Sequence, residues 1–81
     1  MPRARRTPLL PTFGARVRSF RLERGLSQEQ LGFKAGLHPT YISGIERGVR
    51  NVGLRNIVEL AAALGVDPGG LVKGLRPDRR G

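Results

Sequence analysis

The residues that can do chemistry lie in one short stretch, LSQEQLGFKAGLHPTYISGIERG, residues 26–48. Its polar side chains are hydroxyls, amides, an imidazole and charged groups, spaced along two short helical patterns. These groups can donate and accept hydrogen bonds, but they do not make the acid–base or nucleophile–base sets that catalysis needs. Glu23, Glu29 and Glu59 are isolated carboxylates elsewhere on predicted helices. The pattern therefore indicates recognition of a partner, and we expect neither an enzyme nor a catalytic residue.

The composition narrows the kind of partner. Cysteine is absent and histidine occurs once, so we predict no metal site and no cofactor. The net charge is +9, from 15 Lys and Arg against 6 Asp and Glu. Such an excess of positive charge is typical of proteins that bind a polyanion, although basic tails can also serve solubility alone. The charge by itself therefore favours nucleic acid without deciding it.

The length and hydropathy set further limits. With 81 residues the chain has room for one domain. Its apolar runs are much shorter than the ~18 residues that cross a bilayer, and Leu9 and Leu10 between prolines are too short for a signal peptide. We expect a cytoplasmic protein with no membrane contact. Proline and arginine at residues 1–11 predict a flexible basic arm, residues 12–73 form the predicted domain, and residues 74–81 form a basic C-terminal tail.

The elements that position the polar stretch are all predicted to be helices. Thr12 is expected to cap the first helix, and Ser27 with Gln30 matches a capping box that starts the second. Pro39 suits the first position of the third helix, and Asp67 caps a short last one. The sequence thus predicts an all-α, compact five-helix bundle, with helices at about residues 13–24, 28–35, 39–47, 54–64 and 68–72.

The second and third helices have the features of a helix-turn-helix. Gly32 supplies a small residue where the two helices approach each other, and Gly36 supplies a turn residue that can adopt positive φ. Leu37, Ile42 and Ile45 are spaced to lock the third helix onto the rest of the domain. Each feature alone is common, but together they indicate a DNA-binding motif.

Three stretches, GLSQEQLGFKAGL, YISGIERG and NIVELAAALGVDP, resemble the Cro/C1-type helix-turn-helix regulators, also called the xenobiotic-response-element-like family. The resemblance extends from Phe13 to Val72 and implies a lambda-repressor-like DNA-binding domain. The segment HPTYISGIERGVRN most resembles the controller proteins of restriction–modification systems. The chain departs from the usual family pattern at Gly32, Pro39 and Gly44.

This resemblance implies that the third helix enters the major groove of double-stranded DNA. The residues then expected to contact bases are His38, Pro39, Thr40, Ser43, Gly44 and Arg47. The residues expected to contact the DNA backbone are Gln28, Tyr41, Arg50 and Asn51.

Several of these residues have structural alternatives. His38 can be a helix cap instead of a base contact, and Tyr41 can pack over the loop instead of contacting phosphate. Arg21 and Glu46 are expected to form a partly buried ion pair between the first and third helices, as the family resemblance implies, and not to touch DNA.

The leading hypothesis is a sequence-specific transcription regulator that binds a pseudo-palindromic operator as a homodimer. Two recognition helices about one helical turn apart (~34 Å) would read the two half-sites. No sensor domain fits in 81 residues, so autoregulation through the protein's own concentration is expected. The residues predicted for the dimer interface are Leu54, Val66, Leu71, Val72 and Leu75.

Two other functions remain compatible with the sequence. The chain can be the DNA-binding antitoxin of a toxin–antitoxin pair, or a helix-turn-helix module that bridges to another protein. Either would give it a protein partner, and a bridging module would show no salt-dependent binding to duplex DNA. The basic tails can reach the minor groove or remain solvated.

Overall fold

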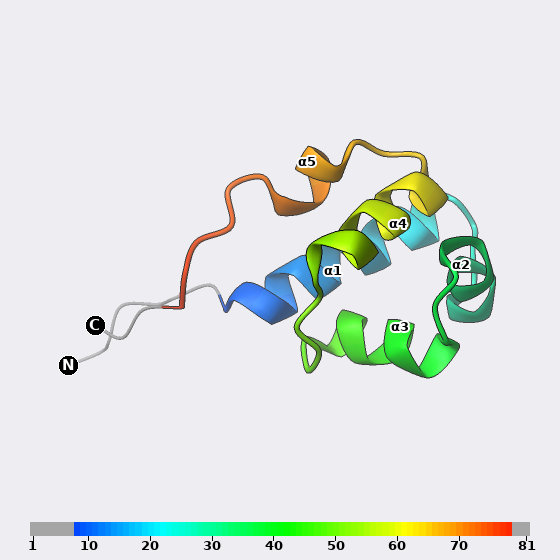
Figure 1. Cartoon of the computed structure of the whole chain (residues 1–81), viewed down its shortest axis with the longest axis horizontal. Helices are drawn as coiled ribbons and strands as arrows, with labels where there is room; N and C mark the ends of the chain where they lie inside the picture. Colours follow the sequence, from blue (N-terminus) through cyan, green and yellow to red (C-terminus); the bar gives the residue numbers. More distant parts are fainter. Residues whose placement is uncertain (1–7, 79–81) are drawn as a thin grey trace.

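The computed structural model describes residues 8–78, and all regular structure in this part of the chain is helical (Figure 1). The predicted all-α fold with five helices is confirmed. The helices are α1 (Leu9–Glu23), α2 (Gln28–Ala35), α3 (Pro39–Arg47), α4 (Leu54–Leu64) and α5 (Pro68–Val72).

Helix α1 begins earlier than predicted. Thr12 is not its cap: the helix begins at Leu9 with Pro8 as the N-cap residue, and the Thr12 hydroxyl donates a hydrogen bond to the Pro8 carbonyl at 2.6 Å. Pro11 is tolerated in the first turn because the N–H groups there have no partner within the helix. Residues 9–11 therefore belong to the domain and not to the predicted arm, whose first seven residues lie outside the described part of the chain.

The chain that follows α5 returns to the start of α1. The Asp78 carboxylate accepts a hydrogen bond from the Leu9 backbone N–H at 2.8 Å, so it satisfies one of the free donors at the N-terminus of α1. Leu75 is half-buried and packs against the core. The segment predicted as a tail thus contacts the domain as far as Asp78, and residues 79–81 lie outside the described residues.

The residues predicted to begin and end α2 and α3 do so in the structure. Ser27 accepts a hydrogen bond from the Gln30 N–H at 2.9 Å, and the Gln30 side chain accepts one from the Ser27 N–H at 2.8 Å, which completes the capping box. Gly36 ends α2 and Gly48 ends α3, with φ of 73° and 80°, a conformation that strains residues with a Cβ. These caps fix where the two helices begin and end.

The core lies between α1, α3 and α4, with α2 and α5 closing it at the sides (Figure 1). Helix α3 packs on α1 and α2, and α2 also packs on α4. Each large core side chain contributes about 2 kcal/mol or more by leaving water. The buried apolar residues are Phe13, Val17, Leu31, Ala35, Ile42, Ile45, Leu60, Ala61, Leu64 and Leu71.

Candidate nucleic-acid interface

Helix α3 begins with its first turn held in place. Pro39 occupies the first helical position, and Nδ1 of His38 accepts a hydrogen bond from the Thr40 N–H at 3.0 Å. The predicted helix-cap role of His38 is therefore confirmed. The imidazole remains exposed beside Thr40, so the cap leaves His38 on the protein surface at the end of α3 that is predicted to contact bases.

One face of α3 is open to solvent. Thr40, Ser43 and Arg47 lie at i, i+3 and i+7, so they share this face. Thr40 and Arg47 are exposed, while Ser43 is half-buried. This spacing presents hydroxyls and a guanidinium along one side of the helix, the groups that contact base edges and phosphates.

The opposite face of α3 is locked into the domain. Ile42 and Ile45 are fully buried there, as predicted. On α1, a Cβ at Gly14 would lie only 2.1 Å from the carbonyl oxygen of Ile45, so α1 and α3 meet backbone to backbone at this point. Gly14 was not predicted from the sequence to have this role. A glycine inside a helical pattern weakens the helix, so its presence is a signal of close packing. The exposed face of α3 is thus carried on a rigid support.

Gly32 makes a similar close contact in the helix-turn-helix. A Cβ there would lie 2.4 Å from the carbonyl oxygen of Leu37, so the need for a small residue at this position is confirmed. The same Cβ would lie 3.4 Å from the backbone nitrogen of Pro39. The atoms close to Gly32 are therefore the backbone of the turn and not the side of α3.

Gly44 is buried although it lies one turn after the exposed Thr40. The side chain of Arg50 covers it. A contact between Gly44 and a base would require Arg50 to move away. In the arrangement of the free protein, Gly44 is therefore not accessible to a base, contrary to the prediction.

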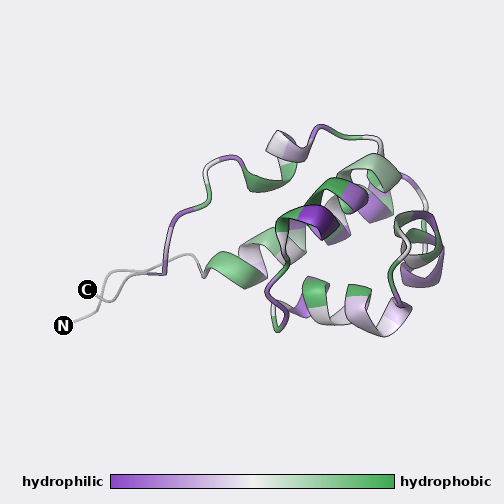
Figure 2. Cartoon of the chain, in the orientation of Figure 1, coloured by the Kyte–Doolittle hydropathy of each residue, from purple (hydrophilic) through white to green (hydrophobic). Residues whose placement is uncertain are grey.

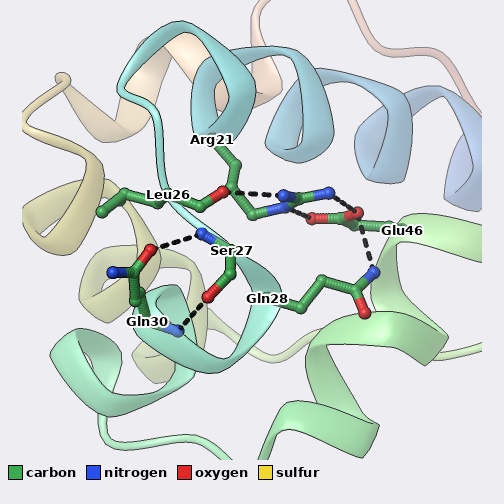
Figure 3. Close-up of polar contacts among 6 residues, drawn as sticks. All are labelled: Arg21, Leu26, Ser27, Gln28, Gln30 and Glu46. Atoms are coloured by element: carbon green, nitrogen blue, oxygen red, sulfur yellow. Dashed lines mark hydrogen bonds and ion pairs between the residues drawn. The ribbon is translucent and has the colours of Figure 1, made fainter.

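The predicted ion pair between α1 and α3 is confirmed, and it is part of a larger network (Figure 3). Arg21 donates from Nε and Nη2 to the two carboxylate oxygens of Glu46, at 2.6 and 3.0 Å, and from Nη1 to the Leu26 carbonyl at 2.8 Å. The side chains of Arg21 and Glu46 are only 9% and 3% exposed. Hydrogen bonding to Glu46 raises the pKa of Arg21 above its usual value, although burial acts in the opposite direction. Arg21 therefore remains charged.

The same carboxylate holds Gln28, the first residue of α2. Nε2 of Gln28 donates to Oε1 of Glu46 at 3.1 Å, so the amide is fixed between α2 and α3 (Figure 3). This contact was not predicted from the sequence. Gln28 is half-buried, and its predicted contact with the DNA backbone stays a prediction.

Three other predicted contact residues lie in α3 and in the loop that follows it. Arg50 and Asn51 are exposed, and the Arg50 guanidinium lies 5.9 Å from the centre of the Tyr41 ring, within the range of a cation–π contact. The Tyr41 hydroxyl accepts a long hydrogen bond, 3.5 Å, from the side-chain amide of Asn56 on α4. Tyr41 thus packs over the loop, as its structural alternative predicted, and its contact with phosphate stays a prediction.

Two further arginines outside the predicted site, Arg16 in α1 and Arg24 directly after it, form hydrogen bonds with distant parts of the domain. Arg16 donates to the Leu71 carbonyl at 3.2 Å, and Arg24 donates to the Leu64 carbonyl at the C-terminus of α4.

Residues 8–78 contain no cluster of His, Asp and Glu arranged to hold a metal ion. Within the same range no helix has the length and apolar character needed to cross a bilayer.

The predicted dimer residues fall into different environments. Leu71 is fully buried because it is the inward-facing residue of α5, so its assignment to a dimer interface is wrong. Val72 is 39% exposed and Leu54 is 77% exposed, whereas Val66 and Leu75 are half-buried and pack on the core.

Helix α4 is less buried than its apolar sequence suggested. Val58 is 46% exposed and lies one turn after Leu54, so the two form an uncovered apolar strip. Val58 was not among the residues predicted for the dimer interface, although the sequence shows its i+4 spacing from Leu54. Figure 2 shows hydrophobic colouring at the start of α1 and around the end of α5. Together with the neighbouring loop and α4, these segments line a shallow apolar hollow formed by Leu9, Leu10, Phe13, Asn51, Val52, Ile57, Val72 and Leu75.

Comparison with known proteins decides the family. A family model described as helix-turn-helix matches residues 17–71, which include both helices of the motif and the core around them. The chain belongs to the Cro/C1-type helix-turn-helix family. The members of this family are DNA-binding transcription regulators.

The similar proteins agree with this assignment. The regulator is 56% identical over 57 residues to the control protein C.BamHI of Bacillus amyloliquefaciens. These residues cover 69% of this chain and 70% of C.BamHI. It is 52% identical to the restriction–modification controller protein C.AhdI of Aeromonas hydrophila, with a TM-score of 0.76 over 76% of this chain and 94% of the other.

The clp gene regulator ClgR of C. glutamicum has a comparable TM-score of 0.78 at 28% identity, over 83% of this chain and 87% of the other. The fold is thus shared among regulators of different genes, whereas sequence identity is higher with the two controller proteins.

Proposed function

We propose that this regulator binds a pseudo-palindromic operator as a homodimer and controls its own expression, in the manner of a restriction–modification controller protein, and that it acts in the cytoplasm. The observation that carries the proposal is the arrangement of α3. Its polar face is open, its apolar face is buried, and the basic loop with Arg50 lies beside it. The identity with C.BamHI and C.AhdI supports the controller role.

Base contacts are assigned to the exposed side of α3. Thr40 can donate or accept a hydrogen bond and can touch a thymine methyl, while Arg47 can reach a guanine or a phosphate. The full set proposed for base contacts is His38, Pro39, Thr40, Ser43 and Arg47. Phosphate contacts are assigned to the flanking groups Gln28, Tyr41, Arg50 and Asn51.

The dimer contact is assigned to the uncovered apolar strip of α4 and the hollow beside it. Leu54, Val58 and Val72 are exposed here, and the hollow adds further apolar surface from α1 and α5. Exposed apolar surface of this kind is a sign of association. A two-fold interface brings the same surface of both subunits together and places two copies of α3 side by side on the duplex.

The test is to recover bound fragments of genomic DNA at about physiological salt and to sequence them. We expect one enriched pseudo-palindrome upstream of the regulator's own gene, near a methyltransferase or endonuclease gene. Even recovery of all fragments, with no enriched motif, would contradict sequence-specific binding. An enriched site beside a small toxin gene would instead support the antitoxin function.

Thr40 and Arg50 are expected to differ in how they affect binding. Thr40→Ala should cost on the order of 1–3 kcal/mol at one base position and relax the preference there, because Thr40 contacts a base edge. Arg50→Ala should weaken binding to all duplexes alike and lower the salt slope by about one unit, because Arg50 contacts phosphate. Fluorescence anisotropy with operator variants at several salt concentrations measures both. Equal weakening of every sequence by Thr40→Ala would contradict the assignment of α3 as the reading helix.

Leu54→Asp is expected to shift the regulator from dimer to monomer and to weaken operator binding. A carboxylate in an apolar interface loses its hydration without gaining a partner. Sedimentation equilibrium gives the oligomeric state. Leu22→Asp is the matched control, since Leu22 is 51% exposed on α1 and outside the proposed interface. A Leu54→Asp protein that dimerises like the wild type would place the interface elsewhere.

A further inference from the structure

We propose that Gly44 is a positioning residue for DNA binding: it forms the seat that holds Arg50 across α3, with the guanidinium over Tyr41 and available to a phosphate. The proposal rests on the proposed function, because it assumes that Arg50 contacts the DNA backbone. It adds that the free protein already orders this arginine before DNA arrives.

Helix formation does not explain why residue 44 is a glycine. It lies in the middle of α3, where glycine is less favourable than alanine. Its φ is not among the positive values of this chain, so its backbone conformation does not require glycine either. Another contact must account for the missing side chain.

That contact is the stem of Arg50. A Cβ on Gly44 would lie 2.7 Å from Cγ of Arg50, 3.3 Å from Nε and 3.6 Å from Cδ. These are the three nearest atoms, and all belong to the same side chain. The place of a normal side chain is therefore occupied by Arg50, which buries Gly44 while Arg50 itself remains exposed.

The second half of the seat is the ring of Tyr41, one turn before Gly44 on the same side of α3. The Arg50 guanidinium carbon lies 5.9 Å from the centre of this ring. Asn56 on α4 donates a long hydrogen bond, 3.5 Å, to the Tyr41 hydroxyl, which restrains the ring. Arg50 is thus held at two points, the stem over Gly44 and the charged head over Tyr41.

Holding Arg50 in this way reduces the conformational entropy that its side chain loses when the protein binds DNA. A free arginine has many rotamers, and a phosphate contact must select one of them. The seat already restricts the rotamers of Arg50 in the free protein. Loss of the seat is therefore expected to reduce affinity for DNA without removing the charge itself.

The test is Gly44→Ala, measured with and without Arg50. The added Cβ meets the stem of Arg50, nearest at Cγ, and not backbone, so rotation of the Arg50 side chain relieves the contact while α3 remains folded. We expect operator affinity to fall roughly 3- to 10-fold, with unfolding stability equal to the wild type or higher. In the Arg50→Ala background the same substitution should change affinity little, whereas in the Arg47→Ala background it should keep its full effect.

A second measurement on the free protein tests the seat directly. In the wild type the Tyr41 ring should shift the NMR resonances of the Arg50 side chain through its ring current, and Gly44→Ala should remove this shift. Unchanged Arg50 resonances, or a lost shift with unchanged operator affinity, would overturn the proposal. Equal effects of Gly44→Ala with and without Arg50 would also overturn it. If the wild type itself showed no salt-dependent duplex binding, the proposed function would fail, and the NMR result would still decide whether the seat exists.

Discussion

Replacing Glu46 with alanine is expected to destabilise the domain by about 3–5 kcal/mol, because it leaves a buried guanidinium without its charged partner. Glu46 accepts two hydrogen bonds from Arg21 and one from Gln28, and its side chain is 3% exposed. Removing it leaves two buried donors of Arg21 and one half-buried donor of Gln28 without their acceptor at once. A loss of this size is a large part of the total stability of a small domain.

Urea unfolding, followed by circular dichroism at fixed protein concentration, measures this loss. Glu59→Ala is the matched control, since Glu59 is an exposed glutamate on α4. Because the pKa of Arg21 is raised, its contribution is fully present below the usual pKa of arginine and is lost only as the pH rises above it. The difference between the variants is therefore expected to be constant from about pH 6 to pH 9. A Glu46→Ala cost below about 1 kcal/mol would mean that the pair behaves like a surface ion pair.

Gly14→Ala is expected to destabilise the domain by about 3 kcal/mol or more, although alanine is the better helix former. The added Cβ would lie 2.1 Å from the carbonyl oxygen of Ile45 and 2.8 Å from that of Glu46. Both atoms belong to the backbone of α3, so no side-chain rotation can relieve the contact. Helices α1 and α3 must move apart, which also strains the bond between Arg21 and Glu46.

Gly70→Ala in α5 is the control for this substitution. A Cβ at Gly70 would have no heavy atom within 4 Å, so the change should be neutral or slightly stabilising. Thermal unfolding of both variants tests the difference. If Gly14→Ala melted at the wild-type temperature, α1 and α3 would not pack as closely as described.

The sequence determined the positions of most helices, because their ends are set by neighbouring residues. The Ser27–Gln30 capping box, the His38 cap and the glycines at 36 and 48 all act within a few residues. Such short-range interactions can be recognised from the sequence without knowing the fold. The family resemblance added the roles of α2 and α3, and the matching family model confirmed the family.

Only the tertiary structure decided which helix faces are covered by other parts of the chain. Gly44 of α3 and Leu71 of α5 were predicted to be accessible to a partner, but both are buried. Whether a position is buried depends on a side chain from elsewhere, as with Arg50 over Gly44. The contact of Asp78 with Leu9 is also invisible in the sequence, because it joins groups 69 residues apart. Local chemistry therefore determined where the helices begin and end, and long-range packing decided what each helix presents to a partner.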